Sequence, residues 1–172
     1  MNKKIYKLEH LTEYIAKFEK AVPTKICESL TNSIVEAINN NVSFKQTDIE
    51  LLSNIQTQLY ITYKNDVIPK IDIGEDSSEY SLELDFLKVE SNCSIRINAG
   101  ADGSSHRFVS FMFVTDAIEK GIDITFNRHE TISKLMVGDI IIFPPFYDHL
   151  ICINTGDEER FCSVTLHACM LY

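Results

Sequence analysis

The sequence predicts an α+β fold in which N-terminal helices brace a β-sandwich or barrel. Up to about residue 79, apolar residues recur at helical spacing. From about Tyr80 onward, short segments rich in β-formers or alternating polar and apolar residues are separated by turn signals. Helices followed by a run of short strands are typical of a sheet covered by helices. We therefore expect a single domain, residues 1–172, with a helical support region at about 1–79 and a β core at about 80–172.

Three helices are expected in the support region. The first is a short amphipathic helix from Leu8 to about Phe18. The second opens at Pro23-Thr24 and ends at Asn39-Asn40-Asn41. The third starts at the capping box Thr47-Asp-Ile-Glu50, where the hydroxyl and the carboxylate each satisfy a free backbone N–H. The second and third helices each carry an apolar stripe at four-residue spacing: Ile26, Leu30, Ile34 and Ile38, then Leu51, Ile55, Leu59 and Tyr63.

The β core is expected to contain about seven strands. Ser94–Asn98 alternates polar and apolar residues, as a half-buried strand does. Phe108–Val114 is rich in aromatic and branched residues, which suit a central strand. The segment Val137-Gly-Asp139 is a turn, and residues 154–159 form a hairpin loop. The remaining strands are predicted at 122–126, 131–136, 140–143, 150–153 and 160–171.

Composition excludes several classes of function. The formal net charge is −9, which argues against binding to nucleic acid or to an anionic membrane surface, because both depend on clustered cations. No apolar run approaches the roughly 20 residues of a membrane span, and the N-terminus has no secretory pattern. Five cysteines without a Cys-x-x-Cys pair are typical of free thiols in a reducing compartment. We therefore expect a cytoplasmic protein.

The residues that could carry chemistry cluster near the C-terminus. Gly138-Asp-Ile-Ile-Ile-Phe-Pro-Pro-Phe-Tyr-Asp-His149 gives a turn, an apolar strand and a proline-braced bend that aims His149. Arg160 opens the next strand, where a buried guanidinium requires an anion. That anion is either a carboxylate of the same hairpin, within 157–159, or a bound ligand. Taken alone, a histidine at a strand start such as His149 is more often a structural hydrogen-bonder than a ligand.

This order of parts resembles the C-terminal half of the Fe(II)/2-oxoglutarate-dependent dioxygenases, in their prolyl 4-hydroxylase-like branch. The resemblance implies a double-stranded β-helix core of the jelly-roll or cupin-like kind. It implies an iron-dependent oxidoreductase that uses 2-oxoglutarate to hydroxylate a protein side chain or a small metabolite. His149 would then be the distal metal ligand, and Arg160 would bind the far carboxylate of 2-oxoglutarate.

Weaker matches extend the resemblance towards the N-terminus. Arg107-Phe-Val-Ser-Phe-Met-Phe-Val is similar to the family's strand of the form Arg-x-hydrophobic-Ser. Lys120-Gly-Ile-Asp-Ile-Thr-Phe resembles its Gly-Gly-Glu-Leu-x-Phe segment, and Val22-Pro-Thr-Lys-Ile-Cys-Glu-Ser-Leu resembles the start of its first supporting helix. The resemblance therefore covers most of the chain.

The first half of the metal motif departs from the family pattern. The family places a His-x-Asp pair before the Arg-x-hydrophobic-Ser strand, and here the matching residues are Gly100-Ala-Asp102. Two interpretations stay open. Either His106 joins Asp102 and His149 as a rearranged triad, or the metal site is degraded and the fold serves as a binding or scaffolding module.

Two further features have alternative interpretations. His167 alternates with apolar neighbours on the last expected strand, so it either lines the barrel or is a core histidine with satisfied hydrogen bonds. Phe108–Val114 and Met170–Tyr172 suit a core or an interface, which leaves the oligomeric state, including a dimer, undecided.

Overall fold

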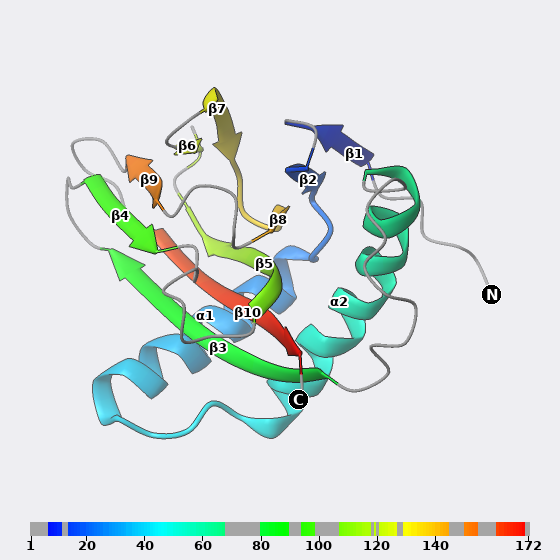
Figure 1. The fold of residues 1–172 in the computed structure, drawn as a ribbon. Coiled ribbons are helices and arrows are strands. Elements are labelled where there is room, and N and C mark those ends of the chain that lie inside the picture. Colours follow the sequence, from blue (N-terminus) through cyan, green and yellow to red (C-terminus); the bar gives the residue numbers. More distant parts are fainter. Residues whose placement is uncertain are drawn as a thin grey trace.

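The structure, a computed structural model, describes residues 7–11, 14–67, 80–89, 94–98, 107–117, 119, 121–126, 129–144, 150–154 and 161–170. Within these residues the chain forms two helices and ten strands (Figure 1). In chain order they are β1 (Lys7–His10), β2 (Ala16–Glu19), α1 (Thr24–Asn40), α2 (Gln46–Asp66), β3 (Tyr80–Val89), β4 (Ser94–Asn98), β5 (Arg107–Asp116), β6 (Ile122–Phe126), β7 (His129–Leu135), β8 (Ile140–Phe143), β9 (Leu150–Asn154) and β10 (Phe161–Met170).

The strands form two antiparallel sheets. The larger has six strands in the order β1-β2-β8-β5-β10-β3, and the smaller has four in the order β4-β9-β6-β7. β10 is the centre of the larger sheet's long strands, since it pairs with β3 along one edge and with β5 along the other. The chain crosses between the two sheets several times, so strands distant in sequence become neighbours (Figure 1). The prediction of an α+β chain in which helices cover a β core is confirmed.

The two faces of the six-stranded sheet pack against different layers. Its outer face packs under the helices, where Phe111 of β5 meets the ring of Tyr60 of α2 edge-on, with centroids 6.3 Å apart. Its inner face packs against the four-stranded sheet, where Met112 of β5 and Ile124 of β6 share one buried cluster. Alternate residues of a strand point to opposite faces, so β5 serves both layers. The molecule therefore has a helix layer and two sheet layers (Figure 1).

The expected helix at Leu8–Phe18 is wrong. Leu8 of β1 lies opposite Phe18 of β2, and β2 continues the six-stranded sheet by pairing with β8. On β2, Ala16 and Phe18 pack towards the helices, whereas Ile15, just before the strand, packs between the sheets. The segment 1–79 thus supplies two strands as well as the helices of the support layer.

The two remaining helices agree with the sequence except at one end. α1 follows Pro23 and ends at Asn41, which has the left-handed φ of 50° that commonly stops a helix. α2 begins at Gln46, with extended Lys45 before it and no side-chain cap. The predicted capping box at Thr47 is therefore wrong, because Thr47 already lies inside the first turn.

The described strands from 94 onward lie close to the predicted ones, and β4, β6 and β8 match them residue for residue. Val109 and residues 111–114 are buried within the chain itself. This supports the core interpretation of that segment over an interface. Within the described part of the chain, neither helix is long and apolar enough to cross a membrane.

Candidate functional site

The four residues that the sequence singles out lie outside the described residues: Asp102, His106, His149 and Arg160. The structure does describe the strand ends that flank them. Asn98 ends β4 and Arg107 begins β5, on either side of Asp102 and His106. Leu150, the first residue of β9, directly follows His149, and Phe161, the first residue of β10, directly follows Arg160. The positions of these ends are what the structure contributes to the candidate site.

The strand ends on either side of the candidate metal ligands are paired with each other. In the four-stranded sheet, Asn98 at the end of β4 lies opposite Leu150 at the start of β9. In the six-stranded sheet, Phe143 at the end of β8 lies opposite Ser110, three residues into β5. The chain therefore crosses twice between the sheets at one end of the molecule, once after Asn98 and once after Phe143. The three candidate metal ligands belong to those two crossings.

Arg160 directly precedes β10, so the pairing of β10 shows which end of the sheet it is next to in the chain. β10 runs antiparallel to β5, so its first residues pair with the end of β5 and its last residues with the start. Cys162 accordingly lies opposite Asp116, and Cys169 lies opposite Arg107. Arg160 therefore precedes the end of β10 that is distant from the two crossings.

The turn before β8 fixes the strand that leads to His149. Asp139 is 2% exposed, and its two carboxylate oxygens accept hydrogen bonds from the backbone N–H groups of Lys20 and Met136, each over 2.9 Å. Burial raises the pKa of Asp139, and those two hydrogen bonds oppose the shift. The Asp139 carboxylate thus links the start of β8 to Lys20, directly after β2, and to Met136, directly after β7.

The inner face of β10 carries three polar residues. Cys162, Val164 and Leu166 pack on the helix side. The alternate residues, which face the other sheet, are Phe161, Ser163, Thr165 and His167, and all four are buried. The neighbouring inner wall, on β5, β6 and β8, is mostly apolar. Among the side chains that the structure describes between the sheets, those of β10 are therefore more polar than those of β5, β6 and β8.

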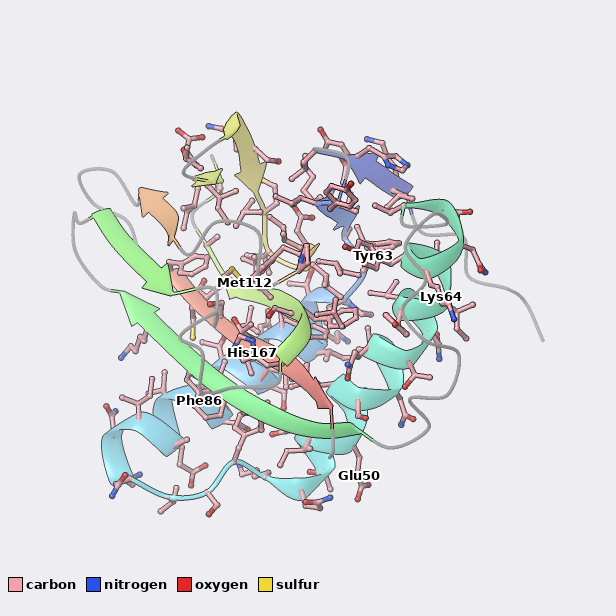
Figure 2. All side chains as sticks on the ribbon, viewed as in Figure 1. Glu50, Tyr63, Lys64, Phe86, Met112 and His167 are labelled. Atoms are coloured by element: carbon pink, nitrogen blue, oxygen red, sulfur yellow. The ribbon has the colours of Figure 1, made fainter. Side chains whose placement is uncertain are left out.

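Ser110 and His167 join this polar strand to β5. They are opposite each other in the ladder, and Ser110 Oγ lies 2.7 Å from His167 Nδ1. Both residues are at most 2% exposed, and Figure 2 shows His167 and Met112 near the middle of the molecule, well away from Glu50 on α2. The direction of this hydrogen bond depends on the tautomer. Of the two interpretations of His167, the structure shows features of both, since it is hydrogen-bonded and it also faces inward.

The candidate donor set fits a divalent transition metal in its chemistry. Asp102, His106 and His149 offer one carboxylate and two imidazoles, the set that non-haem Fe(II) oxygenases use. The two crossings that carry them connect strands whose registers pair Asn98 with Leu150 and Phe143 with Ser110. Within the residues that the structure describes, no three His, Cys, Asp or Glu side chains are grouped to hold a metal.

Ser110 is not among the site residues predicted from the sequence. Its signal was a single hydroxyl inside the apolar strand Phe108–Val114, a position where burial requires a hydrogen-bond partner. That partner, His167, is 57 residues away in the chain, so their contact depends on the strand pairing.

Comparison with known proteins finds similarity in fold and none in sequence families. No family model matches the sequence, and no curated protein matches it by sequence. Among solved structures, it is similar to the viral collagen prolyl hydroxylase vCPH from Paramecium Bursaria Chlorella virus-1 in its 2OG complex, with a TM-score of 0.67 and 16% identity, covering 92% of this chain and 97% of that one.

Two further solved structures belong to the same group. A prolyl-4-hydroxylase from Pseudomonas putida has a TM-score of 0.62 and 9% identity, covering 91% of this chain and 92% of its own. An oxidoreductase of the 2OG-Fe(II) oxygenase family from Burkholderia pseudomallei has a TM-score of 0.53 and 12% identity, covering 76% and 60%. At such low identity the similarity concerns architecture: the chain has the fold of solved prolyl hydroxylases and 2OG-Fe(II) oxygenases.

Proposed function

We propose that the chain is an Fe(II)/2-oxoglutarate-dependent dioxygenase with a double-stranded β-helix core, which hydroxylates a protein side chain or a small metabolite. The observation that carries the proposal is the pair of crossings at one end of the two sheets. Asn98, which ends the strand before Asp102 and His106, lies opposite Leu150, which directly follows His149, and Phe143 lies opposite Ser110 of β5. The fold similarity to 2OG-Fe(II) oxygenases supports the same function.

In this proposal, His149, Asp102 and His106 hold the metal, and Arg160 binds the distal carboxylate of 2-oxoglutarate through a charge-assisted pair. Bound ferrous iron and 2-oxoglutarate supply the oxidation of a substrate C–H bond, which the protein's own side chains do not provide. The chain contributes ligand placement and the exclusion of water. The apolar inner wall, which includes Met112, Ile141 and Phe143, serves the second task because all three side chains are at most 2% exposed.

A second candidate function is a binding or scaffolding module on the same fold. The observation that favours it is Gly100, which stands where the resemblance requires the first metal histidine. A protein of this kind would bind a small polar molecule between the sheets without oxidising it. Metal binding separates the two candidates, because the enzyme needs the metal and the module does not.

The carboxylate clamp is tested by calorimetric titration with 2-oxoglutarate in the presence of Mn(II), which supports binding without turnover. We expect Arg160→Ala to weaken binding by about 1.5–3 kcal/mol, as the loss of a charge-assisted hydrogen bond does. Lys88→Ala is a suitable control, because it removes a cation from β3, the neighbouring strand of the same sheet. Equal affinity of the wild type and Arg160→Ala would reject the clamp.

A further inference from the structure

We propose that the free edge of β1 pairs with β1 of a second copy of this chain, in antiparallel register about Leu8. β1 is the outermost strand of the six-stranded sheet, so among the described strands it has a neighbour, β2, on one side only. A strand edge with unpaired N–H and C=O groups is a template for pairing with another chain. Such pairing does not depend on the proposed function.

The main-chain groups of Leu8 point to the free edge. At the turn between β1 and β2, the N–H of Leu11 donates to the carbonyl of Ile15 over 2.9 Å. Successive residues of an antiparallel strand direct these groups alternately to one side and to the other. Lys7 and Glu9 therefore direct theirs to β2, as Leu11 does, and Leu8 directs its own outward. Two copies joined about Leu8 exchange two hydrogen bonds between their Leu8 residues.

On the face that the hairpin turns towards the smaller sheet, its side chains alternate in charge. Lys7 of β1 lies opposite Glu19 of β2, and Glu9 lies opposite Lys17. Both pairs are ion pairs, with Nζ to Oε2 distances of 2.5 Å and 2.6 Å. Each row across the hairpin thus holds one cation and one anion, and the order of the two signs reverses from one row to the next.

Pairing about Leu8 continues this alternation into the second copy. A two-fold axis makes the contact self-complementary, so Lys7 lies opposite Glu9 of the second copy, and Glu9 lies opposite Lys7 of the second copy. Across four strands, two from each copy, each row then reads Lys17, Glu9, Lys7, Glu19. Opposite charges that face each other across strands are stabilising, and like charges are destabilising.

Lys7 and Glu9 can each take a second partner. Their side chains are 73% and 44% exposed in the single chain. An ammonium group has three donors, and a carboxylate accepts through two oxygens. The ion pairs within the hairpin therefore persist when the pairs between copies form.

The opposite face of the hairpin is apolar. Leu8 lies opposite Phe18, which is fully buried in the cluster under the helices, and Leu8 packs against that cluster while staying partly exposed. In the proposed register, Leu8 lies opposite Leu8 of the second copy. An apolar row then continues from one copy to the other, and pairing removes apolar surface from water.

The contact is small, because β1 has four residues. Interfaces that bury less than roughly 1,200 Å² belong to weak complexes, so we expect a dissociation constant between about 10 μM and 1 mM.

Sedimentation equilibrium over that concentration range tests the pairing against the monomer mass of 19.6 kDa. Lys7→Glu and Glu9→Lys each place like charges opposite each other across the two-fold axis, so each variant alone should stay monomeric. An equal mixture of the two variants restores both opposite-charge pairs, so the dimer should return. Lys45→Glu, a charge reversal directly before α2, is the control and should dimerise as the wild type does.

Restoration on mixing separates the interface from damage to the hairpin, since each substitution also opposes like charges within its own chain. A wild type that keeps the monomer mass at about 1 mM would overturn the proposal. A dimer that both single variants retain would also overturn it, because that dimer would use another face. A mixture that stays monomeric beside a dimeric wild type would reject the register about Leu8.

Hydrogen exchange of single amides, followed by NMR at low and high protein concentration, tests the unsubstituted protein. The Leu8 amide should exchange about 2-fold more slowly when half of the chains are paired, because only unpaired chains expose it. The amides of Lys7 and Glu9, which face β2, should be unaffected. Equal exchange of the Leu8 amide at both concentrations would contradict the pairing.

Discussion

Gly138 and Val22 join the start of β8 to the segment that leads into α1. The N–H of Val22 donates to the carbonyl of Gly138 over 3.0 Å, and the N–H of Gly138 donates to the carbonyl of Val114 over 2.9 Å. Gly138 has a φ of +89°, and a Cβ at this position would lie 2.5 Å from the carbonyl oxygen of Val22. The turn before β8 therefore excludes any side chain.

Gly138→Ala is expected to destabilise the protein. Alanine is strained at positive φ. Its Cβ would also displace the carbonyl oxygen of Val22, a backbone atom in the segment that leads into α1. We expect a loss of at least about 1 kcal/mol in the free energy of unfolding, measured by urea denaturation with circular dichroism. An unchanged denaturation midpoint would contradict this account of the turn.

Two isoleucines on α1 provide a matched pair for the helix layer. Ile34 is fully buried in the cluster under the six-stranded sheet, whereas Ile38, one turn later, is 45% exposed. We expect Ile34→Ala to lower the free energy of unfolding by about 2–5 kcal/mol, because it leaves a cavity. Ile38→Ala should change it by about 0.5 kcal/mol, as surface substitutions do. Equal effects in thermal and urea denaturation would show that the helix packs through a different face.

Asp139 gives stability a specific dependence on pH. Burial raises its pKa in the folded state, so between the ordinary carboxyl pKa and that raised value the folded state binds more protons than the unfolded state. The contribution of this group is therefore fully present below the unfolded pKa and is lost as pH rises through the folded pKa.

The comparison of wild type with Asp139→Asn isolates that contribution. Asparagine cannot accept hydrogen bonds at both of its terminal atoms, so the variant loses stability at every pH. Relative to the variant, the wild type should lose stability as pH rises above about 4. Urea denaturation of both proteins at several pH values measures this difference. A wild type that gains relative stability over the same range would show that the two hydrogen bonds outweigh burial.

The strands of the β core from residue 94 onward could be predicted because their signals are local, whereas β3 was not among the predicted strands. β6 alternates along Ile122–Phe126, and β8 is an apolar run bounded by Gly138 and Pro144. The N-terminal strands could not be predicted, because their structure depends on partners distant in sequence. β2 is four residues long and is held by β8, more than a hundred residues later. Its apolar residues also fit a helix, since short segments do not separate the two periods.

The buried face of α1 differs from the predicted stripe for a geometric reason. Four residues turn an α-helix by about 400°, so a stripe with strict four-residue spacing drifts by about 40° at each step. Ile38 consequently leaves the face that Leu30 and Ile34 bury, and Cys27 and Ala37 complete that face instead.

The sequence predicts the candidate site residues, but it does not predict which side chains contact one another. Asp102, His149 and Arg160 follow from the motif order, and His106 was added because Gly100 replaces the expected histidine. The roles of all four stay predictions because they lie outside the described residues. The contact between Ser110 and His167 follows from the register of β5 and β10, which no local pattern specifies.

Metal-dependent binding of 2-oxoglutarate tests the proposed function most directly. Under anaerobic conditions, Fe(II) and 2-oxoglutarate added together to the wild type should produce a weak visible charge-transfer band. His149→Ala should abolish the band, because it removes one of the proposed metal-binding imidazoles. The absence of a band in the wild type, together with no metal uptake at millimolar Fe(II), would contradict the assignment as a dioxygenase.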